Sequence, residues 1–247
     1  MKKICMLFLV ILLAFCQSVS ADDLDNELNL AVRRGDVEKV KALIVAGADV
    51  NSRQDEHTPL MLAVYGGDFE IAKILIEAGA DVNDAHSTTH TVLYHALESS
   101  RVRADIIQLL IDAGVKMNYS PLIWAMKTRS SEVPEIMVML IEAGADVNER
   151  DEYGATALII AACRGRNQLV DILLRSGAEI NATVEGSYRT ALECGVERGN
   201  IETVRLLIEA GADLDTKDES GNTPLMIAKS KGYQEIIKLL TDAGATR

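Results

Sequence analysis

Apolar side chains in this chain recur at helical spacing in short segments, and polar turns that contain glycine separate these segments. One apolar run covers residues 60–64 and is followed by Gly67, and a second amphipathic segment covers residues 69–78. Gly79 comes directly after the second segment, where helices commonly end in the left-handed conformation that glycine adopts without strain. The pattern predicts two short helices joined by a tight turn.

A short phrase with nearly the same letters returns along the chain. LIEAGADVN occupies residues 75–83 and 140–148, and LIEAGADLD occupies residues 207–215. The glycine of the phrase, or its equivalent, recurs every 30 to 35 residues, at Gly47, Gly79, Gly114, Gly144, Gly177, Gly211 and Gly244. A period of about 33 residues indicates a solenoid, because one helix pair cannot bury its apolar face alone and must stack on its neighbours.

Three signals within the period resemble a known family. The tripeptide TPL begins at Thr58 and at Thr223, and with the mid-repeat glycine and the GADVN phrase it resembles the ankyrin repeat. The resemblance implies an all-α ankyrin-repeat solenoid of about seven helix-turn-helix units with hairpin-like loops. It also implies an L-shaped stack with a concave groove, about 60–70 Å long at ordinary helix spacing. The expected repeats cover residues 27–51, 57–83, 90–118, 119–148, 154–181, 188–215 and 221–246.

The first 21 residues have the features of an export signal. Lys2 and Lys3 give a positive start, residues 4–15 are apolar, and residues 19–21 form a small-residue cleavage site. The apolar run is too short to span a bilayer comfortably. We expect cleavage to release a single ankyrin-repeat domain over residues 22–247 in the periplasm or outside the cell. A lipoprotein is less favoured, because Phe15 precedes Cys16 where a lipobox has a small residue.

Charge narrows the class of partner. The net charge is −12, and it becomes −14 when two of the 25 basic residues leave with the signal. An acidic chain argues against nucleic acid, whose phosphates need a basic surface. Such a chain also repels its own copies, so we expect a monomer. No later apolar stretch is long enough for a membrane helix, so we expect no membrane insertion after signal cleavage.

Two cysteines, Cys163 and Cys194, remain after cleavage, too few for a disulfide framework. In the repeat alignment, Cys163 lies three positions further along its helix than Cys194. A disulfide is therefore disfavoured on geometry, and we expect both thiols to be free.

The third and fourth repeats depart from the pattern. Extra residues separate their helices at 97–105 and 127–135, and Pro134 is expected at a helix start. The connection GVKMNYSPL between the two repeats is too short for a full hairpin. This irregular centre is either a binding feature or loop drift that repeats tolerate.

One column of the repeat is expected to belong to the core. It stands two residues after PL, or at the equivalent place, and contains Leu30, Leu62, His95, Trp124, Ile160, Cys194 and Ile227. Because the column is apolar, His95 is interpreted as a buried core histidine that is held by a hydrogen bond, with Trp124 as a candidate packing partner, and Cys194 is interpreted as a small buried hydrophobe.

A second column predicts the binding residues. The resemblance implies that the positions just before the mid-repeat glycine face the groove. The candidates are Arg33, Arg34, Tyr65, Arg164, Arg198 and Lys231, with Lys127 at an insertion and Tyr153 at a loop tip. We interpret them as a cationic floor with an acidic rim that binds a protein. The alternative is that Lys and Arg favour the dipole at helix ends.

The sequence contains few patterns that would indicate a catalytic site or a metal site. Four histidines, His57, His86, His90 and His95, fall close together, but equivalent positions in successive repeats are too far apart to share an ion. Residues 213–221 resemble a calcium loop but place Lys217 at a ligand position and Asp218 where glycine is needed. No phosphate loop, serine elbow or HExxH occurs. We expect no metal, cofactor or catalytic residue.

These observations favour a non-catalytic periplasmic or secreted scaffold that binds a partner protein through its groove. Two roles stay open, an inhibitor or immunity factor and an accessory factor for an envelope enzyme. The alternative from another class is an enzyme or small-ligand binder that uses the irregular central repeats around His95 and Trp124.

Overall fold

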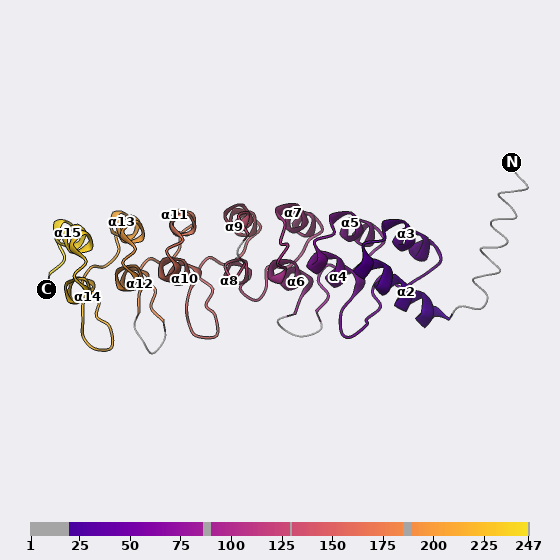
Figure 1. Cartoon of the computed structure of the whole chain (residues 1–247), viewed down its shortest axis with the longest axis horizontal. Helices are drawn as coiled ribbons and strands as arrows, with labels where there is room; N and C mark the ends of the chain where they lie inside the picture. Colours follow the sequence, from indigo (N-terminus) through magenta and orange to yellow (C-terminus); the bar gives the residue numbers. More distant parts are fainter. Residues whose placement is uncertain (1–19, 86–89, 129, 185–188, 247) are drawn as a thin grey trace, which may run out of the picture. The chain divides into compact units, whose positions relative to one another are not determined.

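The computed structural model describes residues 20–85, 90–128, 130–184 and 189–246, and this part of the chain contains fourteen helices (Figure 1). The apolar segment of the expected export signal lies outside the described residues. Within the described residues, none of the helices is long and apolar enough to cross a membrane. The chain divides at residues 116 and 117 into an N-terminal unit, Met1–Lys116, and a C-terminal unit, Met117–Arg247, and each is described by itself.

The helices form pairs, as the sequence predicts. The N-terminal unit contains α2 (Ala21–Arg34), α3 (Val37–Val45), α4 (Pro59–Gly66), α5 (Phe69–Glu77), α6 (Val92–Glu98) and α7 (Ala104–Asp112). The C-terminal unit contains α8 (Pro121–Ala125), α9 (Val133–Glu142), α10 (Ala157–Arg164), α11 (Asn167–Arg175), α12 (Ala191–Arg198), α13 (Ile201–Glu209), α14 (Pro224–Lys231) and α15 (Gln234–Asp242). Each even-numbered helix, called here a first helix, packs on the odd-numbered second helix that follows it.

Stacking joins equivalent helices of successive pairs. In the N-terminal unit the first helices α2, α4 and α6 contact in that order, and so do the second helices α3, α5 and α7. The C-terminal unit repeats this ladder, with α8, α10, α12 and α14 in one row and α9, α11, α13 and α15 in the other. The apolar side chains between the rows are nearly inaccessible to solvent, and burial of such surface stabilises the stack.

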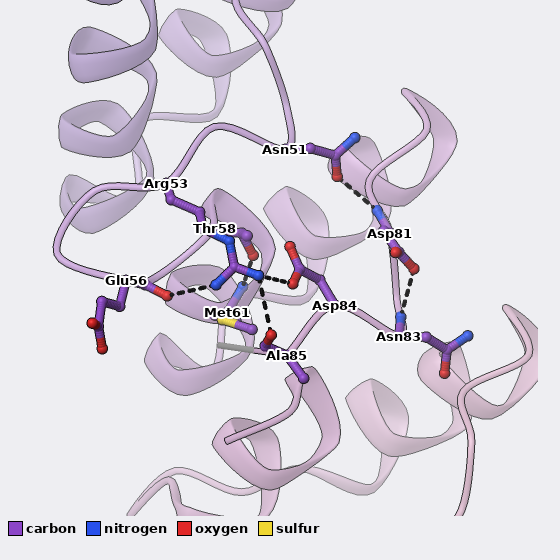
Figure 2. A network of polar contacts seen from close by, with 9 residues as sticks. All are labelled: Asn51, Arg53, Glu56, Thr58, Met61, Asp81, Asn83, Asp84 and Ala85. Carbon is purple, nitrogen blue, oxygen red and sulfur yellow. Dashed lines mark hydrogen bonds and ion pairs between the residues drawn. The ribbon is translucent and has the colours of Figure 1, made fainter. Parts of the chain in front are cut away.

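A threonine begins most first helices. The hydroxyl of Thr58 accepts a hydrogen bond from the backbone N–H of Met61 at 3.3 Å, and Pro59 occupies the first turn of α4 (Figure 2). Equivalent caps begin α6, α10, α12 and α14, at Thr91, Thr156, Thr190 and Thr223. Such a cap typically contributes about 1 kcal/mol, because it satisfies a donor that the helix leaves unpaired.

The recurring GADVN phrase links each repeat to the next. Gly79 adopts a φ of 93°, which ends the second helix of its pair. The carboxylate of Asp81 accepts a hydrogen bond from Asn83 N–H at 2.8 Å, while the Asn51 side chain of the preceding phrase accepts one from Asp81 N–H at 2.8 Å (Figure 2). Asn83 binds Lys116 N–H in the same way. The phrase recurs because its side chains form the hydrogen bonds that connect each repeat to the next.

An arginine braces the loop that follows the phrase. Arg53 forms an ion pair with Asp84 of the next repeat and donates to the carbonyl oxygens of Glu56 at 3.3 Å and Ala85 at 3.2 Å (Figure 2). Arg150 has the equivalent role in the C-terminal unit. Single β-bridges close three of these loops, at Gln54–His57, Ala85–Thr91 and Arg150–Thr156.

The irregular third and fourth repeats have physical causes. Unlike α4 or α10, α6 and α8 do not end at a left-handed glycine, so extra residues connect each to its second helix. Pro134 lies in the first turn of α9, as predicted. In the third repeat the inserted residues bind back to the preceding repeat, since Ser99 donates to the Tyr65 carbonyl oxygen at 2.6 Å and Arg103 donates to that of Gly67 at 3.3 Å.

The expected core column is only partly buried. His95, Cys194 and Ile227 are buried, with exposed fractions of 4%, 0% and 8%, but Leu30 is 38% exposed. Leu62, Trp124 and Ile160 are half-buried. The prediction was wrong for these four because the position lies at the flank of a first helix. At His95 and Cys194 the preceding first helix supplies a contacting side chain, Tyr65 and Cys163 respectively.

The expectation of free thiols was also wrong, because a disulfide joins Cys163 to Cys194 with a Cα–Cα distance of 4.7 Å. The alignment compared equivalent positions, but neighbouring first helices meet through non-equivalent ones. The seventh residue after one cap threonine faces the fourth residue after the next. Tyr65 and His95 show the same register in the N-terminal unit, with ring centroids 6.4 Å apart.

Candidate functional site

The predicted binding residues of the N-terminal unit lie at the ends of α2 and α4. Arg33 and Arg34 are exposed in the last turn of α2, just before the left-handed Gly35. Arg33 lines a depression of about 920 Å³ together with Leu30 and Asp55. Because the depression is wide and carries both charge signs, it presents no single chemistry to a ligand.

Tyr65 belongs to a cluster of rings centred on His95. Tyr65 is 53% exposed, whereas His95 is buried beneath it, as the sequence predicts. Around His95, the ring centroids of His57, Tyr94 and His90 lie at 5.1, 5.3 and 6.1 Å. Of the residues that the structure describes, no group of three is placed to hold a metal ion, and His86 lies outside them. The cluster therefore has the character of a packed aromatic core that reaches the surface at Tyr65.

Burial controls the chemistry of this cluster. It raises the pKa of Tyr94 to about 12, and the neighbouring Glu98 carboxylate contributes in the same direction. The phenol therefore stays protonated even in alkaline solution, where an ordinary tyrosine ionises. His95 is part of the N-terminal unit and Trp124 is part of the C-terminal unit, so the packing of one ring on the other stays a prediction.

The predicted residues of the C-terminal unit follow the ends of successive first helices. Arg164, Arg198 and Lys231 are the last residues of α10, α12 and α14, and Lys127 comes two residues after the end of α8. All four are exposed. Because these helices contact in order, their cations form a series along one edge of the unit, which we call the cationic row.

The two residues at the start of the cationic row are held by neighbours. Arg164 donates to the carbonyl oxygen of Met126 at 2.6 Å, which joins α10 to the end of α8. Lys127 places its Nζ atom 3.4 Å from the centroid of the Trp124 ring, a cation–π contact. These contacts fix the charges without neutralising them.

Arg198 and Lys231 complete the cationic row differently. Neither side chain forms a hydrogen bond or ion pair within the described parts of the chain. Gly199 N–H donates to the carbonyl oxygens of Gly195 and Val196, and Gly232 N–H donates to those of Ala228 and Lys229. A cation at a helix end favours the helix dipole without any hydrogen bond, so the dipole and the binding interpretations of Arg198 and Lys231 both stay open.

Acidic residues lie on the loops that lead into the first helices of the C-terminal unit. Tyr153 is 72% exposed at a loop tip beside the exposed Glu152. In the next loop but one, Asp218 and Glu219 border a cleft of about 220 Å³ that also contains Glu193. Cations thus lie at the ends of first helices and carboxylates lie on loops, and their joint role as the floor and rim of one binding groove stays a prediction.

Glu193 and Asp218 differ in environment. Glu193 is 1% exposed, and burial raises the pKa of its carboxyl although the Thr190 N–H binds it. The pKa of Asp218 is lowered, chiefly because Asn222 N–H donates to it at 2.7 Å. Both side chains serve local structure, Glu193 in the capping box of α12 and Asp218 in its loop.

Two features of this surface were missed by the repeat alignment. The disulfide links α10 to α12 beside Arg164, and it ties together the helices that carry Arg164 and Arg198. Lys229, two residues before Lys231, adds another exposed cation to the last turn of α14. A search for basic residues throughout the last turn would have found Lys229, whereas no sequence signal gave the helix register.

Comparison with known proteins identifies the family. A family model described as Ankyrin repeats (3 copies) matches residues 28–120, 101–184 and 183–246. The chain is 26% identical to the human ASB11 ankyrin repeat domain, with a TM-score of 0.74 over 89% of this chain and 98% of that one. For the ankyrin repeat domain of Bcl-3, the values are 27%, 0.72, 87% and 97%.

Curated relatives match over parts of their length. The Nuclear factor NF-kappa-B p105 subunit of Gallus gallus is 28% identical over 190 residues, 57% of this chain and 19% of that protein. The B-cell lymphoma 3 protein homolog of Mus musculus is 35% identical over 105 residues, 42% of this chain and 23% of that protein. The chain thus spans less than a quarter of the length of these relatives. Ankyrin repeat domains mediate protein–protein interactions and are typically non-catalytic, and this chain belongs to the ankyrin repeat family.

Proposed function

We propose that the chain is an exported, non-catalytic scaffold that binds a partner protein in the periplasm or outside the cell. The observation that carries the binding function is the cationic row. Its charges are exposed at corresponding helix ends in an acidic chain, while the residues that stack the repeats are buried. A rigid, preformed surface loses little entropy when a partner docks.

Two observations support export. The sequence begins with a basic start, an apolar stretch and small residues before Asp22, which is the pattern of a cleaved signal. The Cys163–Cys194 disulfide suits an oxidising compartment, since thiols are kept reduced in most cytosols.

Fractionation of cells that produce the full chain tests export. We expect the protein in the periplasm or medium, with Asp22 as its first residue and with both cysteines resistant to alkylation until a reductant is added. A cytosolic chain that begins at Met1 and has reactive cysteines would contradict the proposal.

Affinity capture tests binding. The mature chain should retain a protein from periplasmic extract, and the Arg198→Glu/Lys231→Glu variant should lose it. A matched control is Arg175→Glu/Lys238→Glu, which makes the same charge change at exposed positions of second helices. Equal capture by both variants would reject the cationic row as the binding surface.

The captured partner decides between the two open roles. An inhibitor or immunity factor lowers the activity of a purified envelope enzyme or toxin, whereas an accessory factor raises or stabilises it. The measurement is the partner's own activity with and without the mature chain.

A further inference from the structure

We infer that the cationic row receives an extended acidic segment of the partner protein, in polyproline II conformation, with a carboxylate at every third residue. The inference rests on the proposed function and names the chemistry of the partner. It depends on the spacing of the row, on the two cations that bind no other group of the described chain, and on the carboxylates carried by loops of the same unit.

The spacing of the row selects the conformation of the segment. Neighbouring packed helices lie about 8–10 Å apart, so the ends of α8, α10, α12 and α14 place one cationic residue at each such step. A polyproline II helix rises about 3.1 Å per residue and turns once every three residues. Carboxylates at every third position therefore share one face and recur about every 9 Å. A β-strand would turn every second one of them away from the row.

The side chains of the row suit carboxylate ligands. Arg198 and Lys231 are exposed and bind no other group of the described chain, so a ligand does not have to displace an existing ion pair. The Arg164 guanidinium is anchored at one nitrogen by the Met126 carbonyl oxygen, and its other N–H groups can donate to a carboxylate. Because the disulfide fixes α10 against α12, the step from Arg164 to Arg198 is rigid.

The acidic loops and the net negative charge favour a single extended segment over a ligand with a wide anionic surface. Glu152 and Glu219 are exposed on loops of the same unit, and the chain has a net charge of −12. A single extended segment can follow the helix ends without covering the loops that carry these carboxylates. A DNA duplex or an anionic membrane presents a wide phosphate surface that meets these carboxylates as well, and the whole protein repels it.

A pair of synthetic peptides tests the spacing. One has ten residues, with glutamate at the first residue and at every third residue after it, and with proline and alanine between. The other has the same composition, with its four glutamates consecutive. We expect fluorescence anisotropy with the oxidised mature chain to show at least tenfold tighter binding of the periodic peptide, and the difference to shrink as salt is added.

Variants of the protein locate the binding. The Arg198→Glu/Lys231→Glu variant should lose at least tenfold in affinity for the periodic peptide, whereas Arg175→Glu/Lys238→Glu should bind within twofold of the original chain. Thermal unfolding of both variants by circular dichroism confirms that each is folded. The Cys163→Ala/Cys194→Ala variant should bind the periodic peptide several-fold more weakly.

Three outcomes overturn the inference. They are equal binding of the two peptides, binding that survives reversal of Arg198 and Lys231, and tighter binding of a DNA duplex or of vesicles rich in phosphatidylglycerol. If these occur while the captured periplasmic protein is still lost on reversal of the row, the proposed function stands and only the acidic, periodic ligand is rejected. If capture also fails to depend on the row, both are rejected.

Discussion

The two units have the same contact between neighbouring first helices but form it with different side chains. In both, the seventh residue after a cap threonine faces the fourth residue after the next one. The N-terminal unit fills this register with the rings of Tyr65 and His95, and the C-terminal unit fills it with the Cys163–Cys194 disulfide. The same helix geometry therefore supports a noncovalent aromatic contact in one unit and a covalent link in the other.

The units also differ at the position just before the mid-repeat glycine. In the N-terminal unit this position, or its equivalent, holds Arg34, Gly66 and Ser99, and Ser99 is bound to the Tyr65 carbonyl oxygen. In the C-terminal unit, three successive first helices end in Arg164, Arg198 and Lys231. Stacking is thus compatible with different side chains at this position, and the series of cations in the C-terminal unit is the reason why we propose it as the binding part.

Breaking the covalent link should have the largest effect. The disulfide spans 31 residues, so its removal in Cys163→Ala/Cys194→Ala should lower the free energy of unfolding by about 3–4 kcal/mol, mainly by releasing the unfolded chain. Chemical denaturation with and without reductant measures this difference. A single-site change, Cys194→Ala, should have nearly the same effect, and a reduced chain as stable as the oxidised one would contradict the prediction.

Breaking the aromatic contact should have a smaller effect. His95→Ala removes a buried ring that contacts four others, and we expect a loss of about 2 kcal/mol in the free energy of unfolding. His57→Ala, at a half-buried ring of the same cluster, should cost less. Partner capture should be unchanged in both variants, because the cationic row belongs to the other unit. Loss of a catalytic or small-ligand activity in His95→Ala with folding intact would instead favour the alternative function.

Local signals explain why most of the fold could be predicted. The cap at Thr58, the proline after it and the left-handed Gly79 act within about twenty residues of sequence, so their spacing determines the helix pair. The contact of Cys163 with Cys194 depends instead on how two helices align side by side. Comparison of equivalent positions cannot give that register.

The candidate site also has one part that could be predicted from the sequence and one part that could not. Exposure of Arg198 and Lys231 follows from their place at helix ends in the repeat. The contacts of Arg164 with Met126 and of Lys127 with Trp124 occur in a repeat whose first helix is shortened to five residues. The repeat pattern has no information about such a departure, so these contacts could not be predicted.

The two capping boxes allow a matched comparison of helix starts. Ser20 and Asp23 cap α2 in the N-terminal unit, and Thr190 and Glu193 cap α12 in the C-terminal unit. Thr190→Ala should cost about 1 kcal/mol in the free energy of unfolding. A chain that starts at Asp22 lacks Ser20, so it should be less stable than one that starts at Ser20 by a similar or smaller amount. Equal stability of these two chains in thermal unfolding would show that the exposed box contributes nothing.

The smallest effect concerns the charge on Glu193. Burial raises the pKa of this carboxyl above its ordinary value of 4.5, so the folded state favours the protonated form. This stabilisation is fully present below pH 4.5 and is lost as pH rises through the folded pKa. Glu193→Gln removes the titration but keeps an oxygen for the Thr190 N–H.

The stability of the variant relative to the original chain should therefore rise across that pH window, as measured by urea unfolding at several pH values. Glu197→Gln is the control from the same helix, because Glu197 is ion-paired with Arg189 and less buried. A stability difference for Glu193→Gln that does not change with pH would show that the buried carboxyl keeps its ordinary pKa.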